Sequence, residues 1–297
     1  MKTIRRIICS LLSMIAVIVA WNTISHRFWN GKEEDGTVRT LQILTYNTHR
    51  MGMYEKPGNN RVIRYLQESK ADILCLQEVE VYKSPRFLTL PELRVALLKY
   101  PYTYYDFKVY NATRQFGNVV FSKYPLKNKH TIRYDSRANL SSCCDVLLGA
   151  DTLRLIVNHL ESNRFEQSDF AIPDSLTKQS VRSSAERINR KLETARKLRI
   201  KQAQEVKREI RRSPYPVIVT GDFNSTPLSY TYQKIKFGLR DCFLESSFGR
   251  LGHTFEKYHF GIRIDYILCS RRLKPIRCEV ERVRFSDHYP VTATIAY

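Results

Sequence analysis

The sequence lacks internal repeats, low-complexity tracts and any cysteine spacing typical of a zinc site. Glycine and proline are scarce, at 11 residues each among 297. This scarcity excludes a collagen-like chain and argues against a disordered one. With a hydrophobic fraction of 43%, the composition indicates an ordinary globular protein, and its length allows one large domain or two small ones.

The seven cysteines show no pattern that defines their pairing. Cys75 and Cys269 lie within apolar strand-like runs, where a thiol behaves as a small hydrophobic group. The adjacent residues 143–144, together with Cys242 and Cys278, offer a disulfide if the protein is outside the cytoplasm. We expect free thiols.

Acidic residues are also scarce: 29 Asp and Glu face 49 Lys and Arg, a formal charge of +20. Such a charge favours a negatively charged partner: nucleic acid, anionic lipid or a phosphorylated small molecule. Residues 178–212 alone contain 13 basic and four acidic residues, a net charge of +9. This segment indicates either a nucleic-acid or membrane surface or a solvent-exposed helix with partial ion pairing. It has no aromatic residue, so base stacking on it is not predicted.

The N-terminus combines positive charge with an apolar run. Lys2, Arg5 and Arg6 precede residues 7–24, which are long enough to span a bilayer. Residues 1–25 are therefore predicted to be a transmembrane anchor that places the rest of the chain outside the cytoplasm. A cleavable signal peptide, which would leave a secreted or periplasmic protein, is the alternative. Residues 26–40 are polar and indicate a linker, and residues 41–297 form the predicted catalytic domain.

Strand-like segments outnumber helical ones in that domain. Alternating or continuous apolar runs predict strands at residues 41–46, 71–76, 102–110, 117–121, 145–148, 152–157, 217–220, 264–269 and 291–295. Helical spacing predicts helices at residues 61–69, 92–99 and 182–212. Strands interspersed with a few helices favour an α/β (α+β) fold in which two sheets pack together with helices outside.

Polar residues follow several of these apolar runs directly. Burying a carboxylate beside a hydrophobic strand is costly unless a partner compensates, and a divalent cation is the usual one. The residue types are hard oxygen ligands and histidine, with no cysteine, which points to magnesium-assisted phosphoester chemistry. The segments are Tyr46-Asn47-Thr48-His49, Leu76-Gln77-Glu78, Gly221-Asp222-Phe223-Asn224 and Ser286-Asp287-His288.

Two further positions extend this set. Asp265 lies between apolar residues and therefore needs a partner, and His159 follows the strand predicted at residues 152–157. Each residue taken singly has an ordinary structural explanation, such as a turn, a surface acid or a buried structural histidine. Their joint occurrence is what favours a site.

In chain order, these segments resemble the endonuclease/exonuclease/phosphatase superfamily, which includes DNase I-like nucleases, neutral sphingomyelinases and inositol-phosphate 5-phosphatases. The resemblance covers nearly all of residues 41–297 and implies a four-layer α/β sandwich with two central mixed sheets flanked by helices. The matching segments are Thr45–Asn47, Leu76–Glu78, Gly117–Ser122 with Pro125, Asn158–Leu160, Gly221–Asn224, Ile264–Ile267 and Ser286–His288.

The resemblance also implies roles for individual residues. Glu78 would be the principal ligand of Mg²⁺, with Mn²⁺ as the alternative, helped by Asn47 and Asp287. Asp222 would orient or deprotonate the attacking water, with His288 as the alternative base, and Asn224 would position the nucleophile or the phosphate. Asp265 would pair with His288, fix its tautomer and keep it cationic. His159 would stabilise the phosphorane or help the leaving oxygen.

Two departures from the family pattern stand out. Some nucleases of this family carry a second acid where this chain has His49, which argues against a second carboxylate ligand and against the abasic-site endonuclease branch. The segment from Glu161 to about Lys191 is long, and we expect it to cover the site or to extend its rim.

The sequence therefore predicts a metal-dependent hydrolase of phosphoester or phosphodiester bonds, anchored to a membrane through residues 7–24. Positive charge favours a nuclease, whereas the anchor favours a lipid or inositol-phosphate phosphoesterase of the sphingomyelinase kind. A non-catalytic binding protein that retains the fold is the alternative from another class, and it would be expected to have lost part of the polar set.

Overall fold

The computed structural model describes residues 38–51, 59–136, 138–165, 169, 178–246, 252–257 and 260–297. Nearly all of these belong to one compact unit, Thr40–Tyr297. The predicted anchor or signal peptide at residues 1–25 lies outside the described residues. Among the helices that are described, none has both the length and the hydrophobicity needed to span a bilayer.

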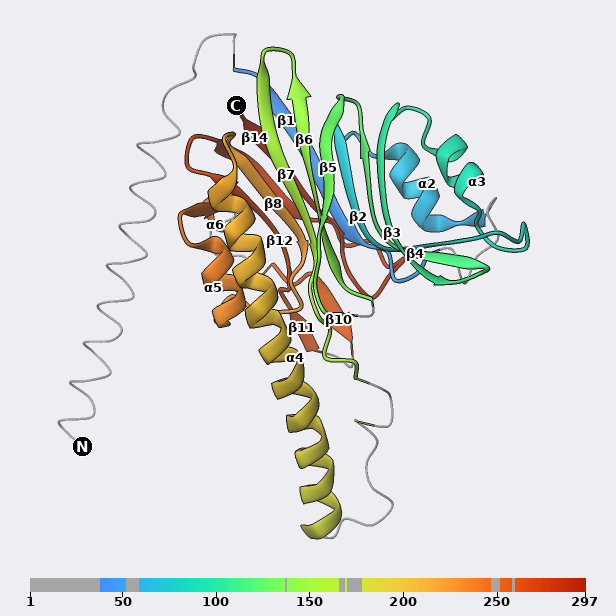
Figure 1. Cartoon of the computed structure of the whole chain (residues 1–297), viewed down its shortest axis with the longest axis vertical. Helices are drawn as coiled ribbons and strands as arrows, with labels where there is room; N and C mark the ends of the chain where they lie inside the picture. The colour runs from blue at the N-terminus through green and yellow to red at the C-terminus, as the bar shows by residue number, and fades with distance from the viewer. Residues whose placement is uncertain are drawn as a thin grey trace, which may run out of the picture. The chain divides into compact units, whose positions relative to one another are not determined.

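Two six-stranded sheets form the centre of the unit (Figure 1). In the first sheet, β1 runs parallel to β2 and the other neighbours are antiparallel. Its order is β13 (Lys274–Val280), β14 (Val291–Ala296), β1 (Thr40–Asn47), β2 (Ile73–Tyr82), β4 (Arg114–Ser122) and β3 (Tyr102–Asn111).

The second sheet is also mixed. Its strands β7 and β8 are parallel, and its other neighbours are antiparallel. Its order is β5 (Leu126–Ile132), β6 (Leu140–Leu148), β7 (Asp151–His159), β8 (Val217–Asp222), β12 (Asp265–Ser270) and β9 (Leu239–Asp241). Helix α6 (Cys242–Ser246) follows β9, and strands β10 (Phe255–Lys257) and β11 (Phe260–Ile262) form a separate hairpin.

Helices cover the outer faces of both sheets. Along β2, Ile73 and Cys75 pack in the core between the sheets, whereas Leu74 and Leu76 pack under α2 (Arg61–Glu68) and α3 (Leu90–Ala96). A third core lies between the second sheet and helices α4 (Lys178–Arg212) and α5 (Tyr230–Lys236). Continuous apolar runs thus become strands buried on both faces, and the predicted four-layer α/β sandwich is confirmed.

Several boundaries differ from the predicted ones for local reasons. Helix α3 begins at Leu90, not at residue 92, because Thr89 and Glu92 form a capping box before it. Strand β6 begins at Leu140, five residues before the predicted start, through small polar residues that are buried. Strands β5 and β13 were not predicted, because exposed charged and polar side chains interrupt their apolar pattern.

The six described cysteines are buried, and no disulfide joins any two of them, in line with the expectation. Neighbouring positions 143 and 144 face opposite sides of β6, so they pack in different cores. Cys242 and Cys269 approach each other, with their sulfur atoms 3.9 Å apart. All six pack within the hydrophobic cores, and Cys143 also lies 3.8 Å from Glu209 Oε1.

Gly221 provides a test of the strand packing beside the predicted site. Its φ of +114° disfavours other residues, and an added Cβ would lie 2.1 Å from the carbonyl oxygen of Asn158 on β7. Gly221→Ala should therefore lower the free energy of unfolding by at least about 3 kcal/mol. Gly149→Ala, at φ +70° with open space around it, should cost only about 1 kcal/mol. Urea unfolding of both variants measures the difference, and equal losses would contradict this account.

Candidate active site

The predicted site residues meet at one edge of the two sheets because of strand direction. In the first sheet, β1 ends there with Asn47. In the second sheet, the parallel neighbours β7 and β8 end there with His159 and Asp222. The antiparallel strand β12 starts at the same edge, so Asp265 is the register partner of Asp222. Residues 286–288 precede β14, which is antiparallel to β1, and they reach this edge too.

Glu78 reaches the site in a different way from the predicted one. It does not end its strand, because β2 continues to Tyr82. The pairing of β2 with β4 shifts register between Leu76 and Val79, and Glu78 has a φ of +54°. A β-bulge of this kind redirects a side chain without ending the strand. The carboxylate therefore comes from the middle of a central strand.

Asn47 connects the two sheets at the centre of the site. Its side-chain nitrogen donates to Glu78 Oε1 at 3.2 Å and to Asp222 Oδ2 at 3.1 Å. Its side-chain oxygen accepts a hydrogen bond from the backbone of His49 at 3.1 Å. Asn47 therefore brings two carboxylates from different sheets together, and its role as a metal ligand stays a prediction.

Asn224 holds Asp222 from the other side. Its backbone and side-chain nitrogens donate to the two oxygens of Asp222 at 2.7 and 3.0 Å, and the side chain also donates to the carbonyl of Leu160. Burial and the negative charge of Asp265 raise the pKa of Asp222. A carboxylate with fixed orientation and a raised pKa is suited to proton transfer near neutral pH.

His288 lies between two carboxylates. Its Nδ1 is 2.9 Å from Asp265 Oδ2, and its Nε2 is 3.8 Å from Asp222 Oδ2. The ring also packs against Phe255, with centroids 4.8 Å apart and the ring planes tilted by 59°. Burial by itself would lower the pKa of His288, but Asp265 and Asp222 outweigh it and raise that pKa to about 10. The imidazole is therefore held as a cation.

His159 and Glu78 form the opposite side of the cluster. The His159 Nε2 lies 3.3 Å from Glu78 Oε1. Burial opposes ionisation of both groups, yet their close contact and mutual attraction lower the pKa of Glu78 to about 2 and raise the pKa of His159. Glu78 is thus ionised across the physiological range and available to a cation.

Asp287 lies nearer the mouth of the site. Its carboxylate is 3.2 Å from Nδ1 of His49, whose side chain is partly exposed. The hydroxyl of Ser286 donates to the carbonyl of Asn47 at 2.8 Å and so ties this loop to the end of β1. His49 stands in the sequence where some family members carry a second acid, and here it pairs with Asp287.

A cavity of about 380 Å³ opens beside these groups. One side of it is polar and the other is apolar, through Phe165, Phe255, Ile262 and Ile264. Residues 162–165, from the start of the long segment predicted as a cover, also line the cavity. The rest of that segment up to residue 177 lies outside the described residues, apart from Asp169.

Helix α4 supports this cavity wall, a role that the sequence interpretation missed. The guanidinium of Arg199 donates to the carbonyl of Glu161 at 2.7 Å and to Asn163 Oδ1 at 2.9 Å. Gln202 accepts from the backbone of Glu161 at 2.9 Å. Both side chains are buried, and they share a helix face with the apolar residues Ala203 and Val206. The sequence does carry a signal for this role, because Arg199 and Gln202 fall on the same helix face as apolar residues.

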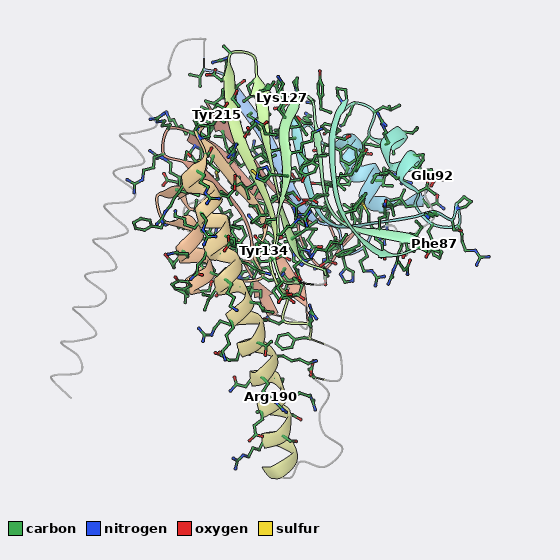
Figure 2. The ribbon with its side chains drawn as sticks, in the orientation of Figure 1. Phe87, Glu92, Lys127, Tyr134, Arg190 and Tyr215 are labelled. Atoms are coloured by element: carbon green, nitrogen blue, oxygen red, sulfur yellow. The ribbon has the colours of Figure 1, made fainter. Side chains whose placement is uncertain are left out.

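The remaining basic residues of α4 include a more exposed group. Figure 2 shows Arg190 on the part of α4 that extends past the ends of the strands. Lys191 and Arg187 pair with the buried Asp169 at 2.7 and 3.1 Å, so part of the helix charge is used within the domain. The helix is therefore partly structural and partly a cationic surface.

The charges of the site fit a divalent cation with hard oxygen ligands. Its carboxylates exceed its two buried imidazoles by two negative charges even when both rings are protonated. The buried Oδ1 of Asp265 has no hydrogen-bond partner among the described residues. The ligand atoms of Asp222, Asp265 and His288 also lie within 4.8 Å of one another, but the ion pair of His288 with Asp265 accounts for that grouping. The carboxylates are those of Glu78, Asp222, Asp265 and Asp287.

The cationic state of His288 can be measured in the metal-free protein. Because its pKa is raised, protonation contributes stability that is complete below about 6.5 and is lost as pH rises toward about 10. Nitrogen chemical shifts of labelled histidine in EDTA should show an imidazolium at neutral pH. Asp265→Asn removes the nearest charge and should lower that pKa. A neutral His288 ring at pH 7 in the parent protein would refute the ion pair.

Comparison with other proteins agrees with the fold. The sequence matches no curated protein. An endonuclease/exonuclease/phosphatase from Beutenbergia cavernae shares the fold, with a TM-score of 0.63 and 17% identity over 87% of this chain and 72% of that chain. Truncated TDP2 from Caenorhabditis elegans gives 0.59 and 17% identity over 87% and 98%. Sphingomyelinase C from Streptomyces griseocarneus gives 0.57 and 19% over 86% and 99%. Residues 44–288 match the Endonuclease/Exonuclease/phosphatase family, and the chain belongs to that family.

Proposed function

We propose that this protein is a metal-dependent phosphodiesterase whose reaction takes place at the shared edge of the two sheets. The convergence of Glu78 and Asp222 on the amide nitrogen of Asn47, with one imidazole beside each carboxylate, carries the proposal. Such an arrangement combines a cation site, a proton acceptor and fixed positive charge within one cluster. Phosphodiester hydrolysis needs all three.

Glu78 is the proposed principal ligand of Mg²⁺ or Mn²⁺, because it is ionised and half-buried at the cavity. Asp287 and the side-chain oxygen of Asn47 would complete the protein's contribution. His288 is a poor ligand, because both of its nitrogens face carboxylates and it is held as an imidazolium. The bound cation would polarise the phosphoryl group and offset the charge that develops on it.

Asp222 is the proposed acceptor of the proton from water. Its orientation is fixed by Asn47 and Asn224, and its raised pKa lies nearer neutral pH than that of an ordinary carboxylate. The protonated state of His288 favours Asp222 over His288 as the base. His288, oriented by Asp265, and His159 would instead place positive charge beside the phosphoryl oxygens.

The cavity wall bears on the substrate. An apolar side made by Phe165, Phe255 and Ile262 suits a phosphodiester with an apolar or aromatic substituent, which favours a lipid phosphodiester as the second candidate. The cationic part of α4 instead favours nucleic acid. We also propose that residues 7–24 attach the protein to a membrane and that the catalytic domain lies outside the cytoplasm. The support for both is the sequence.

The proposed chemistry predicts the effect of two near-isosteric substitutions. With Mg²⁺ and bis-p-nitrophenyl phosphate, Glu78→Gln and Asp222→Asn should each lower kcat/KM by at least about 100-fold, since each removes a charge at the reacting group. Glu245→Gln, at an exposed acid paired with Arg240, is the matched control and should retain activity. EDTA should abolish turnover of the parent protein. Equal turnover in all four proteins would exclude this site.

The substrate class is tested with the same variants. Plasmid DNA, RNA, sphingomyelin vesicles and phosphoinositides are offered at equal phosphate concentration with Mg²⁺. We expect one class to be hydrolysed faster by the parent protein and none to be hydrolysed by Asp222→Asn. Binding of Mg²⁺ in calorimetry without turnover of any substrate would favour a non-catalytic protein, and DNA cleavage alone would exclude the lipid candidate.

A further inference from the structure

A second group of metal-ligating side chains lies on the helix-covered face of the second sheet. His130 comes from β5, Cys143 from β6 and Glu209 from the C-terminal half of α4. None of the three lines the catalytic cavity. Their ligand atoms all lie within 4.8 Å of one another. Three separate elements therefore direct one nitrogen, one sulfur and one oxygen to a common point.

The separations agree with a tetrahedral metal site. His130 Nε2 is 3.4 Å from Glu209 Oε1, and Cys143 Sγ is 3.8 Å from the same oxygen. Zinc bonds of about 2.0 to 2.3 Å at tetrahedral angles place ligand atoms roughly 3.3 to 3.7 Å apart. The two observed distances match this spacing to within a few tenths of an ångström. The third separation, between His130 Nε2 and Cys143 Sγ, is within 4.8 Å.

The orientation of His130 supports a ligand role. Its Nδ1 is 2.9 Å from the carbonyl oxygen of Asn128, and a carbonyl only accepts hydrogen bonds. Nδ1 therefore carries a proton, and Nε2 faces Glu209. In a neutral ring, the lone pair of Nε2 would face the negative oxygen of Glu209, which is repulsive. A proton or a metal ion between the two atoms removes this repulsion. A backbone carbonyl that fixes the tautomer in this way is typical of metal-bound histidine.

The surrounding charges also leave room for a divalent cation. Arg154 binds both oxygens of Asp145 at 2.8 and 3.1 Å and Glu209 Oε1 at 3.0 Å. One guanidinium thus faces two carboxylates, which leaves one negative charge. A thiolate at Cys143 would add a second negative charge, and a divalent cation would neutralise both. The contact with Arg154 uses Oε1, the oxygen that also lies near His130 and Cys143, so a metal would share this oxygen with the guanidinium or bind Oε2.

Cys143 gives the site its selectivity. Burial, together with the charge of Glu209, raises the pKa of the thiol, so the metal-free protein keeps it protonated. A metal that binds sulfur strongly would displace this proton, as structural zinc does. Magnesium and calcium prefer oxygen ligands and would gain little from this set. The half-exposed ring of His130 provides an entry path.

We propose that His130, Cys143 and Glu209 bind one zinc ion, with water as the remaining ligand. The ion would link β5 and β6 to α4. Because α4 also carries Arg199 and Gln202 against the cavity wall, zinc would stabilise the helix on which that wall depends. The site is separate from the proposed catalytic cation site and does not rely on the proposed function.

Cobalt substitution tests this site with a signal that the catalytic site does not produce. The protein is stripped with a chelator and titrated with Co²⁺, and a near-ultraviolet thiolate-to-cobalt band should appear at one equivalent. Zinc should abolish the band, whereas excess Mg²⁺ should leave it. No cysteine lies in the catalytic cluster, so Glu78→Gln should retain the full band.

Substitutions assign the ligands. Cys143→Ala should abolish the band, and His130→Ala should weaken Co²⁺ and Zn²⁺ binding by at least about 100-fold, since loss of a ligand exceeds loss of an outer partner. Cys144→Ala is the matched control, because that thiol is adjacent in sequence but faces the core between the sheets. It should keep the band. His130 is half-exposed, so its variant should fold even if a core variant does not.

Thermal unfolding gives an independent readout. Zinc at micromolar concentration should raise the Tm of the parent protein and of Cys144→Ala, because a ligand that binds only the folded state stabilises it. It should leave the Tm of His130→Ala unchanged. Absence of the band in the parent protein, or an equal band and equal zinc-dependent Tm in His130→Ala, would overturn the proposal and leave an imidazolium–carboxylate pair at this position.

Discussion

The hydrogen bonds from one amide nitrogen, that of Asn47, hold the active edge of this protein together. Glu78 and Asp222 belong to different sheets, and both accept a hydrogen bond from the same nitrogen. Two buried carboxylates at such a short separation repel each other. The shared donor compensates part of this cost, and His159 and His288 compensate more. The hydrophobic core between the sheets aligns them, and the proposed cation site depends on keeping this pair of charges close.

The sequence predicts which residues gather at this edge better than it predicts how the backbone brings them there. Apolar runs followed by polar residues indicate strands that deliver side chains to one edge, and Asp222 and Asp265 do lie there as register partners. Glu78 does not follow that rule, because a bulge inside β2 turns it toward the site. A bulge depends on how two strands pair, and pairing between distant segments leaves no local signature.

The same limit explains what was missed around the helix. Charge counts describe residues 178–212 as a basic surface, yet Arg199 is buried and holds the cavity wall through Glu161. The group of His130, Cys143 and Glu209 shows no metal-ligand spacing, since its members come from three elements far apart in the chain. Sequence spacing detects ligands on one hairpin or helix, whereas ligands gathered by tertiary packing appear only in the fold.

Charge is distributed unevenly between the site and the rest of the chain. The protein carries a formal charge of +20, but its active edge concentrates carboxylates that repel a phosphodiester. A positive field at long range would bring an anionic substrate to the protein, and a bound cation at short range would let it approach Glu78 and Asp222. Under the proposed function, the basic surface would attract the anionic substrate from a distance, and the bound cation would let that substrate contact the acidic site.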